Sequence, residues 1–301
     1  MIKPMTILDW AILGLAALLL GSTFVFMNIA VSEVHPFTVA ATRAIVAAPI
    51  CWALMIVFGA KMPRSREEWI VFFWLGVLTA AIPFGTVAWG QQHIESGLAG
   101  ILFGTSPIMS VILAPLFLKE ERLTSRRLIG SIIGFIGIVL LIGPSVLANA
   151  TDQILGGLIT LLAPISHTLG AIYARHHPKL APPAMATGQM IFGSIILLPL
   201  AFYFENSLEI KVSGIATGAM IWVGIATAFA MSLYFLAVKR VGAARVSLVP
   251  LFFPVVAVIL GFIILKERLP VEAFLGLAFI LTGAVAVSSA SQKKLNSLTK
   301  E

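Results

Sequence analysis

Apolar residues in this chain form long runs that are separated by short polar turns. Each run holds about 20 residues, which is the length a helix needs to cross the hydrocarbon core of a bilayer. Because the turns are short, consecutive helices are expected to pack as antiparallel neighbours. The polar composition of residues 292–301 predicts a disordered cytoplasmic tail. The predicted spans are 8–30, 36–59, 68–92, 96–118, 124–143, 153–175, 182–204, 214–238, 243–265 and 270–290.

The same pattern of landmarks occurs twice along the chain. The turn Leu118-Lys119-Glu120 returns 147 residues later as Leu265-Lys266-Glu267. A proline before the turn returns at the same interval, and two glycines after it return 146 residues on. These landmarks pair Pro107 with Pro254, Gly130 with Gly276 and Gly137 with Gly283. The chain is therefore predicted to be an internal duplication, with repeats at 1–150 and 151–291.

Each repeat holds five predicted spans, and an odd number of spans inserts the second repeat upside down relative to the first. The predicted fold class is an all-α integral membrane protein with ten transmembrane helices in two inverted five-helix repeats. Inverted repeats place a binding site near the bilayer midplane and allow alternating access when one half rocks against the other. The pattern therefore favours a transporter.

Composition excludes a soluble protein. Of the 301 residues, 59% are hydrophobic and 11% are charged, and the mean hydropathy is +1.03. A soluble domain carries about 25% charged residues. The net charge of +7 does not indicate nucleic acid, because the basic residues lie in turns between apolar runs. Cys51 is the one cysteine, so an intrachain disulfide is impossible.

The basic residues also predict the orientation of the chain. Sixteen Lys and Arg residues fall on one side of the predicted spans and three on the other, while Arg43 lies within a span. Cytoplasmic loops carry the excess of Lys and Arg, so both termini are expected in the cytoplasm.

The register of the duplication places symmetric helix faces toward one another. Spacings of three and four residues keep each set of side chains on one face. Together they predict a mostly apolar cavity with a few hydrogen-bonding groups, which suits a small amphiphile, although ordinary helix packing would explain each residue alone. The substrate-binding candidates are Phe24, Asn28, Phe84, Gln91, Phe103, His167, Met231 and Tyr234. Pro107 and Pro254 are predicted to kink their helices, as gating hinges or as static shape.

Ionisable groups inside the predicted spans are few, and every Asp and Glu lies at a span edge, in a turn or in the tail. Arg43 lies about two turns into the second span, so it is interpreted first as a structural anchor that reaches the interface and second as a contact for a substrate carboxylate. His167 lies deeper and is interpreted as a packing residue or as a titrating group near neutral pH.

These features resemble the drug/metabolite transporter superfamily, in particular its EamA-type ten-helix exporters, over residues 8 to 290. The resemblance rests on the two repeats, each with a Pro-containing helix, a Lys-Glu turn and a Gly-spaced final helix. Leu20-Gly21-Ser22-Thr23-Phe24 is similar to a first-helix pattern that usually opens with Trp-Gly-Ser/Thr, and Arg43 matches an arginine common in the second helix. His167 stands where the family often has a tryptophan.

The resemblance implies export of small metabolites from the cytoplasm across the bacterial inner membrane, with no cofactor, and with the lipid bilayer and a small molecule as the only expected partners. Amino acids, hydrophobic or aromatic ones first, fit the predicted cavity, and backbone groups at the proline positions are expected to bind their charged ends. Drugs or organic cations are the alternative. Phosphorylated compounds would need more cavity-facing Lys or Arg. The sequence holds no catalytic motif that would indicate an intramembrane enzyme. A metal transporter would depend on His176-His177 or on His93 with Glu95, all of which lie at turns.

Overall fold

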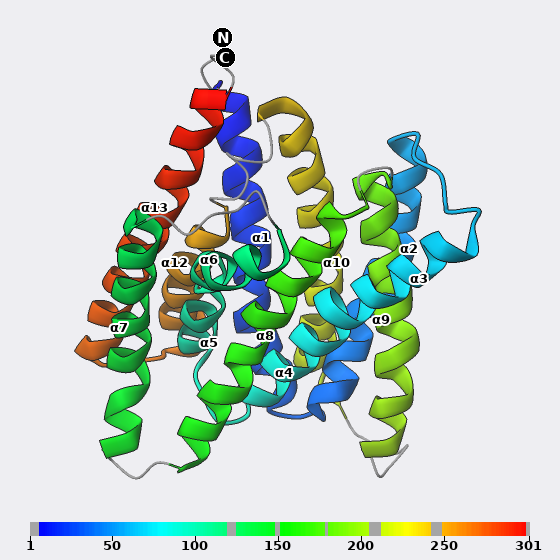
Figure 1. The fold of residues 1–301 in the computed structure, drawn as a ribbon. Helices are drawn as coiled ribbons and strands as arrows, with labels where there is room; N and C mark the ends of the chain where they lie inside the picture. The colour runs from blue at the N-terminus through cyan, green and yellow to red at the C-terminus, as the bar shows by residue number, and fades with distance from the viewer. Residues whose placement is uncertain are drawn as a thin grey trace.

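The computed structural model describes residues 6–118, 125–147, 151–177, 180–204, 212–241 and 249–298, and every regular element in these ranges is helical (Figure 1). The first repeat contains α1 (Ile7–Val31), α2 (Pro36–Val57), α3 (Arg66–Gly76), the π-helix η1 (Val77–Ala81), α4 (Ile82–Gly90), α5 (Ser96–Phe103), α6 (Ser106–Phe117) and α7 (Ser125–Leu147). The second contains α8 (Thr151–Arg175), α9 (Pro182–Phe204), α10 (Gly214–Val241), the 3₁₀-helix η2 (Val249–Phe252), α12 (Phe253–Leu260), the π-helix η3 (Gly261–Leu265) and α13 (Val271–Leu298).

The described helices confirm the predicted fold class. Seven helical segments are long and apolar enough to span a membrane, and three shorter apolar segments occupy the remaining predicted windows. The start of α1 and the end of α13 lie at the same end of the bundle, and α8 runs in the opposite direction to α1 (Figure 1). The disorder expected from residue 292 onward is wrong for residues 292–298, because α13 continues as a helix through Leu298.

Local sequence signals explain where several helices begin and end. Thr6 and Asp9 form a capping box at the start of α1, and Ser65 with Glu68 forms another at the start of α3. These side chains satisfy backbone N–H groups that have no partner within a first helical turn. At the far end of η3, Lys266 takes a left-handed conformation with φ of 57°, which reverses the chain before α13.

The two repeats are interleaved, which differs from the expected packing of consecutive helices. The most extensive contacts join α7 to α13, α1 to α10, α2 to α9, α2 to α10, α4 to α8 and α5 to α12, and each of these pairs takes one helix from each repeat. Pairing consecutive helices would leave the matched faces of the repeats on the outside. Interleaving instead turns those faces toward each other.

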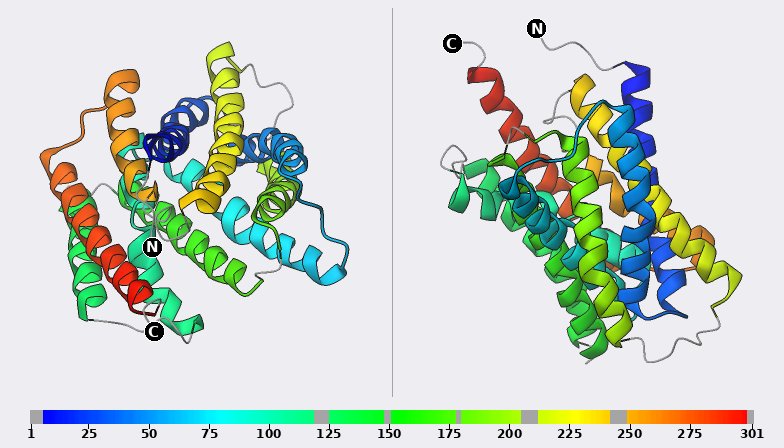
Figure 2. Two further views of the ribbon diagram at one scale, coloured as in Figure 1. Left: turned by 90° about the horizontal axis from the view of Figure 1, so that it is seen from above. Right: turned by 90° about the vertical axis from the view of Figure 1, so that its right-hand side faces the viewer.

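Glycines allow α7 and α13 to pack backbone against backbone along one edge of the bundle (Figure 2). A Cβ on Gly137 would lie 2.7 Å from the carbonyl oxygen of Gly276, and one on Gly283 would overlap the carbonyl of Gly130. Because the duplication pairs Gly130 with Gly276 and Gly137 with Gly283, the two contacts exchange with each other under a two-fold rotation. This is direct geometric evidence for the inverted symmetry of the repeats.

The outer surface of the bundle is apolar. Large hydrophobic side chains point outward from helices all around it, including Leu18, Trp52, Phe135, Phe229 and Phe274. Exposed apolar surface on this scale has no place in water and fits contact with lipid. Polar side chains are buried instead between the helices, where the candidate site lies.

Candidate functional site

The α-helices of the fourth and ninth spans break at equivalent positions beside the matched prolines, at the turn of residues 104–105 between α5 and α6 and at the junction where η2 passes into α12. Pro107 lies in the first turn of α6 and Pro254 lies in the first turn of α12. The expected kink at Pro107 is therefore a two-residue turn between two helices, and the one at Pro254 is a direct passage from a 3₁₀-helix into an α-helix. Proline fits there because the first turn of a helix has N–H groups without intrahelical partners, so none is lost.

The two breaks meet in the middle of the bundle. A Cβ on Gly104, in the break between α5 and α6, would overlap the ring of Pro254, and one on Gly100 would lie 2.5 Å from the Cβ of Ala257. The carbonyls next to the first break are already occupied, since the hydroxyls of Thr105 and Ser106 donate to main-chain oxygens at 2.7 and 2.6 Å. The backbone there is therefore a poor site for a substrate.

Four rings from four helices form an aromatic cluster beside these breaks. The ring of Phe103 on α5 lies 5.8 Å from Phe24 on α1, 5.6 Å from His167 on α8 and 6.3 Å from Phe253 on α12. The structure thus brings together three of the predicted site residues, which lie as far apart in sequence as 24 and 167. Sequence reasoning missed Phe253, although it directly precedes Pro254.

Arg43 is buried between α2, α4 and α10 and does not reach the interface as an anchor would. Only 9% of it is exposed, its guanidinium carbon lies 3.9 Å from the ring centroid of Phe84, and its Nε donates to the hydroxyl of Thr227 at 2.9 Å. The Thr227 hydroxyl donates in turn to the carbonyl of Val223 at 2.6 Å. All these partners are neutral, and no carboxylate pairs with Arg43 in the part of the chain that the structure describes.

Gln91 and Asn28 join α4 to α1 through main-chain carbonyls. The side-chain nitrogen of Gln91 donates to the carbonyl of Phe24 at 2.8 Å, and that of Asn28 donates to the carbonyl of Gln91 at 3.2 Å. Gln91 is 4% exposed, and its side-chain oxygen is buried with no hydrogen-bond partner in the structure. Phe24 therefore links this amide pair to the aromatic cluster.

The remaining candidates lie on the periphery of this arrangement. Phe84 is buried against Arg43 rather than in the aromatic cluster. Met231 and Tyr234 are half-buried on α10 and pack against the same hydrophobic core. Thr227, also on α10, was not predicted, because its position in the repeat corresponds to an alanine and carries no signal in one sequence.

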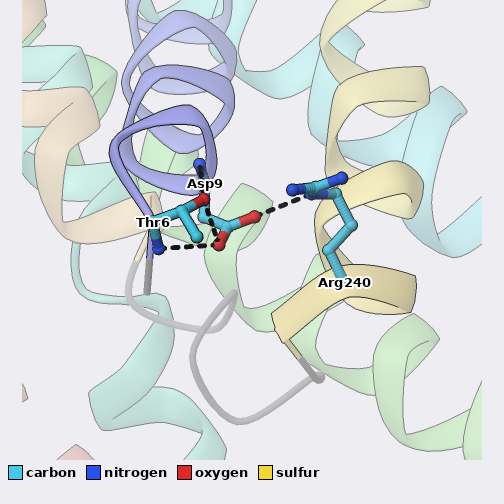
Figure 3. A network of polar contacts seen from close by, with 3 residues as sticks. All are labelled: Thr6, Asp9 and Arg240. Carbon is cyan, nitrogen blue, oxygen red and sulfur yellow. Dashed lines mark hydrogen bonds and ion pairs between the residues drawn. The ribbon is translucent and has the colours of Figure 1, made fainter. Parts of the chain in front are cut away.

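Polar contacts between the repeats lie near both ends of the bundle. At one end, the carboxylate of Asp9 accepts from Thr6 and pairs with Arg240 on α10 at 2.7 Å (Figure 3). At the other, Glu267 accepts from the backbone N–H groups of Ser96 and Gly97 at 2.8 and 3.0 Å and so caps α5 of the other repeat.

The capping carboxylate of Glu267 also affects its neighbour Glu95. Burial, and next the negative charge of Glu267, raises the pKa of the Glu95 carboxyl. The residue equivalent to Glu267 in the first repeat is Glu120, which lies outside the described residues.

Apolar helices that enclose a polar centre between two inverted repeats define a membrane transporter. The sequence matches the EamA-like transporter family over residues 9–143 and again over 154–289, so the chain belongs to this family.

Several relatives align over most of the chain. An "Uncharacterized transporter" of Archaeoglobus fulgidus is 28% identical over 282 residues, which is 92% of this chain and 98% of that protein. The "Uncharacterized inner membrane transporter YedA" of Escherichia coli is 26% identical over 275 residues, 89% of this chain and 86% of that protein. A solved crystal structure, 19% identical, superposes with a TM-score of 0.66 over 92% of this chain and 96% of that chain, and so has the same fold.

Proposed function

We propose that this transporter exports small amphiphilic metabolites that carry a carboxylate, most of all amino acids with hydrophobic or aromatic side chains. It lies in the bacterial inner membrane with both termini in the cytoplasm and works by alternating access between the repeats. The location draws on the inner membrane transporter of Escherichia coli that is similar to it, and the orientation draws on the excess of basic residues on one side.

The single observation that carries this proposal is the buried guanidinium of Arg43. A cation within a membrane is expensive to keep unless a charge or several hydrogen bonds compensate it. The guanidinium of Arg43 contacts only the hydroxyl of Thr227 and the ring face of Phe84, and its other N–H groups find no acceptor among the described residues. Planar guanidinium groups bind carboxylates through two parallel hydrogen bonds, so a substrate carboxylate supplies the missing partner.

The aromatic cluster suits the rest of such a substrate. The ring of His167 on α8 contacts Phe103, and α8 packs along α4, the helix whose Phe84 lies under the guanidinium of Arg43. Aromatic faces bind apolar and aromatic groups through dispersion and edge-to-face contacts. The alternative, efflux of organic cations, is disfavoured because Arg43 would repel a cation brought to this centre.

Counterflow in proteoliposomes tests the proposal. Vesicles loaded with phenylalanine should take up labelled phenylalanine, whereas vesicles loaded with phenethylamine, which lacks the carboxylate, should not. Arg43→Met should lower the uptake by about 10-fold or more, since hydrogen bonds to charged groups contribute about 1.5–3 kcal/mol. Arg64→Met, at an exposed arginine in the turn before α3, is the matched control and should leave uptake unchanged.

Thermal unfolding of each variant in detergent shows whether Arg43→Met still folds. Exchange of phenethylamine without exchange of phenylalanine would overturn the proposal in favour of cation efflux. Full uptake by a folded Arg43→Met protein would remove the guanidinium from substrate binding.

A further inference from the structure

The side-chain amides of Asn28 and Gln91 are fixed in orientation. Each uses its nitrogen to donate to a main-chain carbonyl, of Gln91 and of Phe24 respectively. A carbonyl can only accept, so neither amide can be flipped without losing its hydrogen bond. Both side chains consequently direct an oxygen away from the contact between α1 and α4.

These two oxygens are acceptors without donors. The Gln91 Oε1 atom is buried and receives no hydrogen bond, and no donor to Asn28 Oδ1 occurs within the described ranges. Buried polar groups in folded proteins are satisfied in nearly all cases, so such an acceptor indicates a place for a ligand group or a water molecule. Because Gln91 is only 4% exposed, bulk solvent does not supply a hydrogen-bond donor to its oxygen.

The surroundings favour a cation that only donates hydrogen bonds. Gln91 is the C-cap of α4, and Asn28 lies in the last turn of α1, so the negative ends of two helix dipoles point at this place. A primary ammonium group has three N–H donors and no acceptor, and so matches both the unpaired oxygens and the helix C-termini.

Arg43 contacts one face of α4, and Gln91 belongs to the same face. Arg43 lies over Phe84, and Phe84 and Gln91 are seven residues apart, which is about two helical turns. The guanidinium and the Gln91 oxygen therefore lie along one helix face, which a single substrate can contact with its two charged ends.

We infer that Gln91 Oε1, together with Asn28 Oδ1, binds the ammonium group of the substrate while Arg43 binds its carboxylate. The inference rests on the proposed function and narrows its range of substrates. The transporter selects free amino acids, and it rejects carboxylates whose amine is acylated or absent.

Competition in the phenylalanine counterflow assay tests this selectivity. Three unlabelled competitors share the carboxylate and the ring: phenylalanine, N-acetylphenylalanine and 3-phenylpropionate. Phenylalanine should compete about 10-fold better than the other two. Gln91→Met keeps the length of the side chain but removes the acceptor oxygen, together with the Nε2 donor to Phe24, so it should reduce this preference to about two-fold while competition by the carboxylates remains. Gln92→Met, at the exposed neighbouring glutamine, is the control and should keep the full preference.

Each outcome bears on the inference. Equal competition by all three compounds in the unaltered protein would overturn it and leave the role of Arg43 intact. A full preference in Gln91→Met would overturn it as well. A lower unfolding temperature of Gln91→Met with an unchanged preference would limit Gln91 to the contact between α4 and α1, and the inference would be wrong. Failure of all three compounds to compete would overturn the proposed function and this inference together.

Discussion

At the scale of single residues, the hydroxyl of Thr227 holds the guanidinium of Arg43 in place. It accepts from Arg43 and donates to Val223, so both its hydrogen bonds are made in the interior. Thr227→Val keeps the shape but leaves the Nε–H of Arg43 without an acceptor, which should destabilise the fold by about 1–3 kcal/mol.

Thermal unfolding in detergent measures this effect, and Thr217→Val provides the control. Thr217 is exposed on the same helix, and its hydroxyl donates to a backbone carbonyl one turn away, as that of Thr227 does. The Thr217→Val protein should unfold close to the temperature of the unaltered protein. Equal shifts in the two variants would show that the contact with Arg43 does not stabilise the fold.

The sequence predicted several site residues, but it did not predict their partners. Helical spacing and the duplication identified Phe24, Phe103 and His167, which the structure brings into contact. It gave no indication that Arg43 bonds a residue 184 positions away. A membrane helix is apolar on its lipid-facing side and on its buried side alike, so the pattern of one sequence does not show which helix faces which.

At the scale of helices, glycines set the distance between α7 and α13. A Cβ on Gly283 would meet the backbone of Gly130 and Gly134, which cannot move aside as a flexible side chain can. Gly283→Ala should therefore force the two helices apart and destabilise the fold by about 1–3 kcal/mol.

Gly218 on α10 offers a matched control, because a Cβ there meets nothing within 4 Å. Gly218→Ala should be neutral or stabilise the fold by up to about 1 kcal/mol, as alanine favours a helix over glycine. Chemical unfolding of both variants in mixed micelles measures the difference. The prediction fails if Gly283→Ala unfolds at the same denaturant concentration as Gly218→Ala.

The helical spans were predictable because length and apolar character alone determine them. The breaks were not predictable in detail. Proline can bend a helix or begin a new one, and only the neighbouring helices decide between these outcomes. Here α5 ends in a hydrogen-bonded turn at Gly104, whose lack of a side chain admits the ring of Pro254.

At the scale of the whole molecule, interleaving changes what alternating access requires. Two separate halves could rock as rigid bodies, but here each repeat is packed against helices of the other. Contacts near both ends, Asp9 with Arg240 and Glu267 with α5, join the repeats as well. We expect the moving units to be pairs such as α1 with α10 and α4 with α8, which exchange with each other under the symmetry of the duplication.

The orientation of these pairs across the membrane follows from the excess of basic residues on one side, and it can be measured. Arg64 lies before α3 and Lys266 after η3, both are exposed, and an odd number of predicted spans separates them. Single cysteines at these two positions should therefore react from opposite faces. The native Cys51 is buried and contributes little background. In intact cells a membrane-impermeant maleimide should label Lys266→Cys, while Arg64→Cys should need permeabilised cells. Labelling of Arg64→Cys but not of Lys266→Cys in intact cells would place the basic face outside the cell and reverse the direction assigned to export. Labelling of both from the outside would contradict the odd number of spans between them.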